Sequence, residues 1–223
     1  MSSQKIADRI FLSWRRAAGE RRFIVGVFQR TNDGSATFNY LVDNIRKAFE
    51  TGFRPMTAFP NLEERYQNVL PLISRRLVDP ERSDRIDYLK FWAANDDDHD
   101  AFDLIALTQA WLTNDRYEFL ADFNVHSGLT FITDLAGQTH LNLGKDEVKE
   151  NDGLTFENET DNEFDPEAVA VLSGTGRKVG YIKKVHCRAF SPEVLNGLTP
   201  TITVHKREMN GKLRRLFVKC SFS

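Results

Sequence analysis

The sequence predicts an α+β protein in two parts: a small antiparallel sheet plus helices over residues 1–125, and a small β-barrel with one short helix over residues 128–223. Short apolar segments with a two-residue alternation, which is typical of half-buried strands, occur near both ends of the chain. Between residues 41 and 114 the apolar residues instead recur at helical spacing. A polar stretch that contains glycine, residues 124–128, follows this region and is typical of a domain boundary.

The N-terminal part begins with three predicted strands. Residues 9–14 and 22–30 are rich in apolar and β-branched side chains, and residues 37–40 resume an alternating pattern after the sequence Thr-Asn-Asp-Gly-Ser. Because short polar turns with glycine join neighbouring antiparallel strands, these segments predict a small antiparallel sheet.

Four helices are predicted after this sheet, over residues 41–51, 61–78, 83–94 and 100–114. The first should stop at Gly52, since glycine readily adopts the left-handed conformation that follows a helix. Asn61 can cap the second helix, and Pro71 should kink or split it because proline has no backbone N–H.

The C-terminal part is predicted to contain six strands and one short helix. The strands are expected over residues 129–136, 154–158, 168–172, 178–182, 201–207 and 213–220. Asn210 and Gly211 are a strong hairpin signal between the last two strands, because both residues tolerate the positive φ of a tight turn. The helix is expected over residues 184–190. Several short strands around one helix predict a compact barrel, a shape that binds single-stranded nucleic acid in other proteins.

Composition restricts the function classes. The 223 residues include 17 Phe, which is enough apolar material for ordinary globular cores. No run of about 18 apolar residues could span a membrane, and the N-terminal segment lacks the apolar core of a signal peptide. The two cysteines, Cys187 and Cys220, are far apart in the sequence. We therefore expect no disulfide scaffold, no membrane association and a cytoplasmic location.

The near-neutral net charge of −2 hides a segregated pattern. Residues 1–90 carry a net charge of +5, residues 91–170 a net charge of −16, and residues 171–223 a net charge of +9. The overall balance therefore excludes no polyanionic partner, and the position of the basic segments in the fold decides whether one can bind.

One stretch of the C-terminal part carries a recognisable motif. Residues 162–171 read Asn-Glu-Phe-Asp-Pro-Glu-Ala-Val-Ala-Val, and residues 178–184 read Lys-Val-Gly-Tyr-Ile-Lys-Lys. This order of asparagine, aspartate, Ala-Val-x-Val strand and Gly-Tyr-Ile-Lys-Lys run resembles the HIRAN domain family, and the resemblance covers about residues 128–223. It implies a small β-barrel that binds DNA, in the best-known members the 3′ end of a single strand. Residues 1–125 are not assigned to a family.

The resemblance places Asn162, Phe164 and Asp165 in a DNA-binding loop, and Tyr181, Lys183 and Lys184 beside it. An aspartate can accept a hydrogen bond from a terminal ribose hydroxyl, and an asparagine amide can donate to a phosphate or a base edge. The two aromatic rings could stack on bases, and the two lysines near a helix start could bind phosphate. Structural roles are the alternative: the aspartate would fix the turn before Pro166, and the rings would pack in the core.

The chain departs from the family pattern in the first strand of this part. Thr133 and Asp134 stand where DNA-binding members carry a basic residue and an aromatic residue, so a phosphate contact and a stacking platform are missing. The basic final hairpin could supply a phosphate track of its own. Its candidate DNA-binding residues are Lys206, Arg207, Arg214 and Arg215. Alternatively, the hairpin docks on the acidic segment 91–170, within one chain or between chains.

The sequence carries no motif for catalysis or for cofactor binding. It has no phosphate-binding loop, no nucleophile elbow, no zinc-protease motif and no Cys/His set at ligand spacing. His186 and Cys187 are adjacent on a predicted helix, where their side chains would point about 100° apart. The acidic residues 95–100 lack calcium-loop spacing and predict a solvated loop that caps the next helix through Asp98 or Asp100. We expect no enzyme, no cofactor and no metal site.

Two functions of different classes follow from these observations. The first is a non-enzymatic DNA-binding accessory protein, for single-stranded DNA or DNA ends, in bacterial repair or phage defence. The second is an interaction or regulatory module that binds a nuclease, a toxin or its own copy. The motif and the basic tail favour DNA, whereas the missing first-strand aromatic and the acidic middle segment favour a protein partner.

Overall fold

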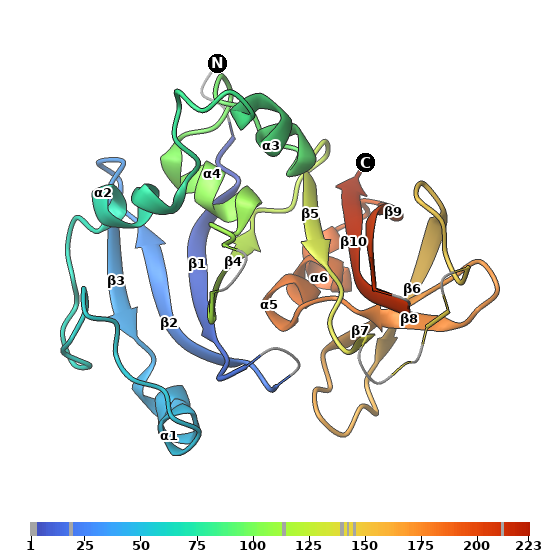
Figure 1. The fold of residues 1–223 in the computed structure, drawn as a ribbon, viewed down its shortest axis with the longest axis horizontal. Coiled ribbons are helices and arrows are strands. Elements are labelled where there is room, and N and C mark those ends of the chain that lie inside the picture. The colour runs from blue at the N-terminus through green and yellow to red at the C-terminus, as the bar shows by residue number, and fades with distance from the viewer. Residues whose placement is uncertain are drawn as a thin grey trace. The chain divides into compact units, whose positions relative to one another are not determined.

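The computed structural model describes residues 4–17, 20–112, 115–138, 141, 143–144, 146–210 and 212–223. The chain divides into two compact units, Met1–Asn124 and Val125–Ser223. Each contains an antiparallel sheet and short helices, so the predicted α+β class is confirmed (Figure 1). Among the described residues, no helix combines the length and the apolar character needed to cross a membrane.

The first unit is built on a four-stranded antiparallel sheet with the order β3-β2-β1-β4 (Figure 1). Its strands are β1 (Ala7–Trp14), β2 (Phe23–Arg30), β3 (Ala36–Tyr40) and β4 (Tyr117–Phe123). The first three agree with the prediction, but the residue pattern does not predict β4. Two acidic side chains of β4 are buried, Glu118 paired with Arg22 and Asp122 paired with Arg9.

The connection from β3 to β4 is helical in several places. It contains α1 (Val42–Glu50), α2 (Leu70–Ile73), the 3₁₀ helix η1 (Ser74–Arg76), α3 (Arg85–Phe91) and α4 (Ala101–Thr108). The helices predicted over residues 41–51, 83–94 and 100–114 therefore form with shorter bounds, and residues 113 and 114 lie outside the described part of the chain. As predicted, Asp100 caps α4, because its carboxylate accepts a hydrogen bond from the Asp103 amide at 2.9 Å.

The helix predicted over residues 61–78 is wrong for most of its length. Tyr66 instead pairs with Phe38 of β3 through two backbone hydrogen bonds of 2.8 and 2.9 Å. These bonds satisfy backbone groups at the outer edge of β3, and that gain outweighs the local helical pattern. The helix begins only at Leu70, with Pro71 in its first turn, where the missing N–H costs no hydrogen bond.

Aromatic side chains form much of the core of the first unit. Phe28 lies between Phe38 and Phe119, with ring centroids 4.6 and 5.3 Å away. Phe59, from the loop before α2, packs on Phe38 at 4.6 Å. All four rings are buried, so this loop is part of the core rather than a solvated connection.

The strands of the second unit follow the predicted pattern. They are β5 (Thr130–Asp134), β6 (Gly153–Glu159), β7 (Ala168–Leu172), β8 (Lys178–Tyr181), β9 (Pro200–Asn210) and β10 (Lys212–Phe222). Short helical segments follow β8, namely α5 (Lys184–Cys187), the 3₁₀ helix η3 (Arg188–Phe190) and α6 (Pro192–Leu195). Gly211 of the predicted Asn-Gly turn lies outside the described residues.

The strands of the second unit form one sheet with the order β5-β10-β9-β6-β7-β8. In the described part of this unit the sheet is not closed into a barrel by a continuous ladder, and in this respect the barrel prediction is wrong. Its two edges meet in a short seam, in which Ala136 and Tyr181 exchange backbone hydrogen bonds of 2.8 and 3.0 Å. The chain turns away directly afterwards at Gly137, whose φ is +76°, so the pairing ends there.

Replacing Gly180 with alanine should destabilise the second unit by about 1–3 kcal/mol, because the added methyl group overpacks this seam. A Cβ at Gly180 would lie 2.7 Å from Leu135 Cβ and 3.0 Å from the Ala136 oxygen, and its φ of +155° already disfavours a side chain. Gly174→Ala is the matched control, because a Cβ there meets nothing within 4 Å. Urea unfolding measured for both variants would contradict this account if their losses were equal.

Candidate nucleic-acid interface

The loop between β6 and β7 is folded around the side chain of Asn162. The Asn162 Oδ1 accepts hydrogen bonds from the backbone N–H groups of Phe164 and Asp165, at 3.0 and 3.1 Å. The Asn162 Nδ2 donates to Glu159 Oε2 at 2.9 Å. Because both ends of the amide are engaged, Asn162 sets the shape of the loop, and asparagine is a residue type well suited to this turn.

Glu159 connects this loop to β8. Its carboxylate accepts a hydrogen bond from the Tyr181 hydroxyl at 3.0 Å and forms an ion pair with Lys178. Lys178 also donates to the Tyr181 hydroxyl at 2.7 Å, and its Nζ lies 4.8 Å from the centroid of the Tyr181 ring. Hydrogen bonds from Lys178 and then Asn162 lower the pKa of Glu159, so the carboxylate stays ionised and holds the loop at neutral pH.

A β-bulge explains why Lys178 and Tyr181 share one side of β8. Residues three apart on a regular strand face opposite sides of the sheet. Here Val171 pairs with Gly180 and Leu172 pairs with Lys178, so Val179 is an extra residue. The bulge rotates the chain between the two side chains and brings both onto Glu159. The sequence pattern does not predict the roles of Glu159 and Lys178, because the alternation that it assumes is broken at this point.

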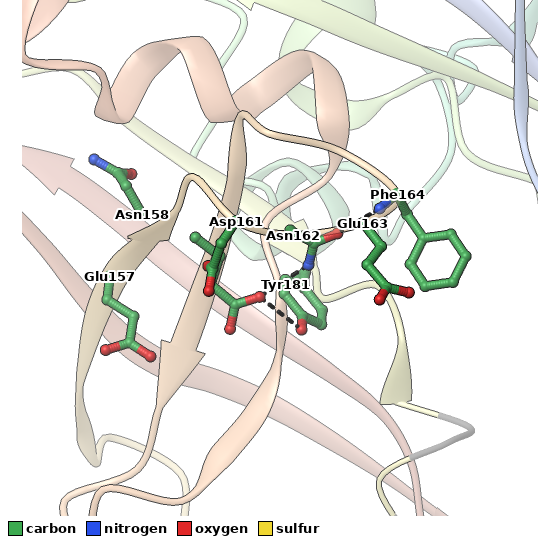
Figure 2. Close-up of a pocket in the computed structure, with 8 residues that line it drawn as sticks. Glu157, Asn158, Asp161, Asn162, Glu163, Phe164 and Tyr181 are labelled. Atoms are coloured by element: carbon green, nitrogen blue, oxygen red, sulfur yellow. Dashed lines mark hydrogen bonds between the residues drawn. The ribbon is translucent and has the colours of Figure 1, made fainter.

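An open pocket of about 650 Å³ lies beside the loop (Figure 2). The pocket is lined by Glu157, Asn158, Glu159, Asp161, Asn162, Glu163, Phe164 and Tyr181. Four of these residues are acidic, and we call this site the acidic pocket. Glu157, Asp161 and Glu163 are exposed on its rim. The rim therefore repels phosphate and attracts hydrogen-bond donors and cations.

Next to the acidic pocket, the loop presents the exposed aromatic ring of Phe164 and contacts the exposed amine of Lys184. The Phe164 side chain is 90% exposed, the most exposed large apolar side chain among the described residues. Figure 2 shows its ring extending from the loop, on the opposite side of Tyr181 from Glu157 in this view. Asp165 follows directly, and its Oδ2 lies 3.2 Å from the Nζ of the exposed Lys184. The exposed ring and the residue that binds this cation are thus adjacent in the loop.

Tyr181 is less available for stacking than Phe164. Lys178 lies over its ring, and a Cβ placed on Gly137 would be only 3.1 Å from Tyr181 Cδ2, so the backbone at Gly137 packs closely against the ring edge. The Tyr181 backbone also forms the seam with Ala136. These contacts give Tyr181 a supporting position, in which it orients Glu159 and, through Glu159, Asn162.

Lys183 lies apart from its neighbour Lys184. Its side chain is only 3% exposed and forms an ion pair with Asp134 at the end of β5. Arg215 approaches the other oxygen of Asp134, with a distance of 3.6 Å from Nε to Oδ2. Asp134, one of the two residues that depart from the family pattern, therefore binds two of the predicted DNA contacts in a largely buried cluster. Lys183 does not reach the loop surface.

The remaining hairpin candidates do not form one exposed track. Lys206 Nζ lies 3.5 Å from Glu150, and Arg207 donates to the Val148 carbonyl at 2.7 Å. Arg214 is exposed and is the extra residue of a bulge in β10, since Leu213 pairs with Met209 and Arg215 pairs with Glu208. The structure thus brings together Asn162, Phe164, Asp165, Tyr181 and Lys184. Lys183 is instead buried against Asp134, and Lys206 and Arg215 form ion pairs with acidic residues outside this set.

His186 should make the second unit sensitive to acid. Burial, and secondarily the nearby Lys183, lowers the pKa of His186 to about 3, although Asp134 opposes the shift. Below about pH 6.5 the unfolded chain takes up a proton that the folded chain does not, so the free energy of unfolding should fall by up to about 1.4 kcal/mol per pH unit. Urea titrations of wild type and His186→Leu at pH 7, 5.5 and 4.5 measure this. Parallel losses in both proteins would contradict the assignment.

The two cysteines are free and buried, and burial raises the pKa of the Cys187 thiol to about 11. A thiol of this kind is a poor nucleophile at neutral pH. Among the described residues, no group of three or more His, Cys, Asp or Glu side chains is arranged to hold a metal ion. The loop itself presents an exposed ring, an amine and several hydrogen-bond acceptors.

Residues 128–223 match the family model of the HIRAN domain, which confirms the resemblance found in the sequence for this part of the chain. No family model matches the N-terminal region. Two crystal structures are similar to part of the chain. The HIRAN domain of human HLTF is 17% identical, with a TM-score of 0.32, over 41% of this chain and 74% of that chain. A protein from Lactobacillus plantarum is 15% identical, with a TM-score of 0.33, over 43% of this chain and 95% of that chain. No curated protein matches the chain.

Proposed function

We propose, from the HIRAN match of residues 128–223, that this part of the chain binds DNA through the loop between β6 and β7. The preferred substrate is single-stranded DNA or a DNA end, whose unpaired bases can reach a protruding ring. The protein would act without catalysis, as a cytoplasmic accessory factor in bacterial repair or phage defence. The role of residues 1–124 is outside this proposal.

The exposure of Phe164 is the observation that carries the proposal. A ring that is 90% exposed contributes nothing to the core, and leaving it in water is unfavourable. The loop that holds the ring is nevertheless well defined, because Asn162 binds the Phe164 and Asp165 amides. A protruding aromatic side chain on an ordered loop is a suitable platform for an unstacked base.

The charges around the ring decide how a nucleotide can lie on it. The acidic pocket repels phosphate, but carboxylates accept hydrogen bonds from base amino groups and from ribose hydroxyls. The phosphates must then lie on the side of Lys184, which is 63% exposed. Asp165 currently binds Lys184 at 3.2 Å, and a phosphate that takes over this amine would release a carboxylate oxygen as an acceptor.

Fluorescence anisotropy tests the proposal with labelled single-stranded, duplex and 3′-recessed oligonucleotides across a salt series. We expect the tightest binding to the unpaired substrates, with an affinity that falls as salt rises, because phosphate contacts release counterions. Absence of binding at about 100 µM protein, or binding that is indifferent to salt, would count against a phosphate-driven site.

Replacing Phe164 with alanine should weaken binding of single-stranded DNA by about 1–3 kcal/mol, or roughly 5- to 150-fold, through loss of one stacked base. The fold should be unchanged, because the ring packs on no core residue. Ile86→Ala, which truncates another exposed apolar side chain, 66% exposed in the first unit, is the control. Equal affinities for the two variants would show that Phe164 is not the platform.

A protein partner is the second candidate, because the same acidic pocket and exposed ring would suit a cationic segment of a nuclease, a toxin or a second copy of the chain. Purification of partners from the native host, with and without added single-stranded DNA, discriminates the two candidates. A partner retained by Lys184→Glu and lost with Glu157→Gln and Glu163→Gln would favour protein binding. The reverse pattern would favour DNA.

A further inference from the structure

An exposed basic stripe lies on the short helical segment that follows β8. Helix α5 continues into η3 without a break, since Cys187 and Arg188 both have helical backbone angles. His186, Cys187, Ala189 and Phe190 are buried, whereas Lys184 and Arg188 are exposed. Residues four apart on a helix are neighbours, about 5–6 Å between Cβ atoms, so the two cations lie along one solvent face.

The stripe begins at the loop that carries Phe164. Lys184 Nζ lies 3.2 Å from Asp165 Oδ2, and Asp165 is the residue next to Phe164. Arg188 lies one helical turn further from this contact. A strand whose terminal base lies on Phe164 would therefore meet Lys184 first and Arg188 next.

A route over the acidic pocket is closed to a polyanion by charge. Glu157, Asp161 and Glu163 are exposed on the rim of the acidic pocket, and a phosphate passing over them would meet three carboxylates. A phosphate backbone is therefore repelled on a route over these acidic side chains and attracted on a route along the basic face of α5 and η3. Electrostatics selects the second.

We propose that Lys184 and Arg188 form a phosphate track, in which Arg188 binds the backbone phosphate one nucleotide beyond the one bound by Lys184. This inference rests on the proposed DNA-binding function and adds to it a contact residue and a strand direction. A guanidinium group suits this position, since its planar fork can donate two parallel hydrogen bonds to one phosphate. Neither the motif nor the basic hairpin of β9 and β10 identifies Arg188.

The test compares Arg188→Gln and Arg188→Lys with Lys149→Gln, which removes one exposed charge elsewhere in the same unit. For a single-stranded oligonucleotide, Arg188→Gln should weaken binding about three- to tenfold near physiological salt and reduce the salt slope by about 0.7, the value for one phosphate contact. Arg188→Lys should keep most of the slope, and Lys149→Gln should match wild type. If Arg188→Gln had the same affinity and the same salt slope as Lys149→Gln, the proposed phosphate track would be wrong.

A neutral methylphosphonate placed at one linkage at a time gives the strand direction. The effect of Arg188→Gln should vanish when the neutral linkage replaces the phosphate that Arg188 binds, and should persist at all other linkages. A loss that is independent of linkage position would contradict a defined contact. If wild type itself binds no oligonucleotide, the proposed function fails; if wild type binds and only these comparisons fail, the phosphate track alone is wrong.

Discussion

Replacing Lys183 with methionine should destabilise the second unit by about 3–5 kcal/mol, although Lys183 belongs to the motif that points to DNA. The lysine side chain is only 3% exposed, and its ion pair with Asp134 lies where β5 meets the start of α5. Methionine fills a similar volume but leaves the Asp134 carboxylate, 11% exposed, without this cation. Breaking one half of a buried pair is costly because Asp134 loses its closest cation in a poorly solvated site, and Arg215, 3.6 Å away, compensates only in part.

Lys184→Met is the matched control, because the same substitution one residue later removes an exposed amine. It should leave stability close to wild type and weaken DNA binding instead. Amide hydrogen exchange of β5 and β10, read by mass spectrometry, measures the local opening free energy of the second unit directly. The double variant Lys183→Met with Asp134→Leu should recover much of the loss, since both buried charges are removed together. Unchanged protection in Lys183→Met, with lost binding, would instead make Lys183 a DNA contact.

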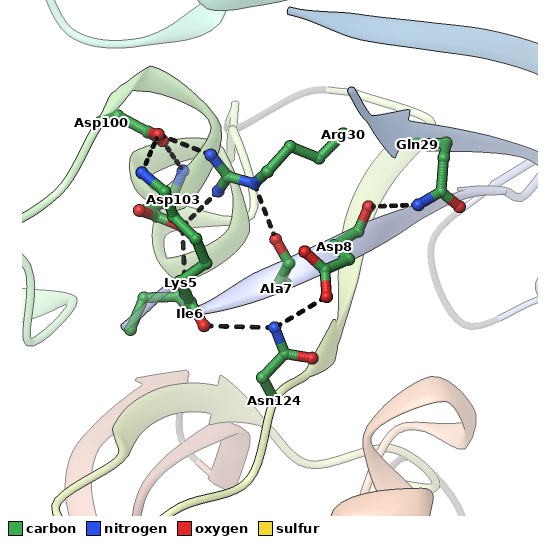
Figure 3. Close-up of polar contacts among 9 residues, drawn as sticks. All are labelled: Lys5, Ile6, Ala7, Asp8, Gln29, Arg30, Asp100, Asp103 and Asn124. Atoms are coloured by element: carbon green, nitrogen blue, oxygen red, sulfur yellow. Dashed lines mark hydrogen bonds and ion pairs between the residues drawn. The ribbon is translucent and has the colours of Figure 1, made fainter. Parts of the chain in front are cut away.

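Replacing Arg30 with methionine should destabilise the first unit by a similar amount, about 3–5 kcal/mol. The Arg30 side chain is 8% exposed and forms ion pairs with Asp100 and with Asp103, whose side chain is 3% exposed (Figure 3). Its Nε also donates to the Ala7 carbonyl at 3.1 Å, and its guanidinium lies 4.5 Å from the Phe102 ring centroid. One side chain therefore connects β2, the start of β1 and the first turn of α4.

Burial and several partners, Arg30 among them, shift the pKa values of the two aspartates in opposite directions. Burial would raise the pKa of Asp100, but hydrogen bonds from Lys5, the Asp103 amide and Arg30 outweigh it and hold the pKa well below its usual range. At Asp103 burial prevails and raises the pKa despite the opposing charge of Arg30. Without Arg30, ionised Asp103 would lose its main compensating charge in a buried position.

Tryptophan fluorescence during urea unfolding measures this effect in the first unit alone, because Trp14, Trp92 and Trp111 all lie within Met1–Asn124. Arg16→Met is the control, since Arg16 forms a surface ion pair with Glu20, with side chains 62% and 38% exposed, and its loss should change unfolding little. Equal unfolding midpoints for Arg30→Met and Arg16→Met would mean that the contacts of Arg30 with Asp100, Asp103 and Ala7 are dispensable for stability.

Local patterns predicted most of the strands because the signals lie within each segment or in the turn beside it. In the second unit, residues 201–220 alternate across an Asn-Gly turn, whereas residues 168–172 and 178–182 are short apolar runs joined by a turn with two glycines; the structure confirms these strands. Strand β4 escapes prediction because its sequence, Tyr-Glu-Phe-Leu-Ala-Asp-Phe, is buried on both faces and carries acidic residues that distant arginines neutralise. Such pairings between residues far apart in the sequence leave no local signal.

The sequence predicted which residues belong to the loop of the candidate site, but not which of the neighbouring side chains are exposed or which residues support the loop. The resemblance to the HIRAN family places Asn162, Phe164, Asp165 and Lys184 in or beside one loop, and the structure brings them together there. The resemblance does not separate Lys183 from Lys184, because the helix that follows β8 turns one lysine inward and the next outward. Nor does it reveal the support from Glu159 and Lys178, which depends on the bulge at Val179.

Photo-crosslinking tests the central claim most directly, with a single-stranded oligonucleotide that carries a photoreactive base at its terminal position. If DNA binds as proposed, the crosslinked peptide identified by mass spectrometry should be the one that contains Phe164, and the crosslink should be lost in Phe164→Ala. A terminal crosslink on the hairpin of β9 and β10, or on residues 4–124, would contradict the loop between β6 and β7 as the site of recognition.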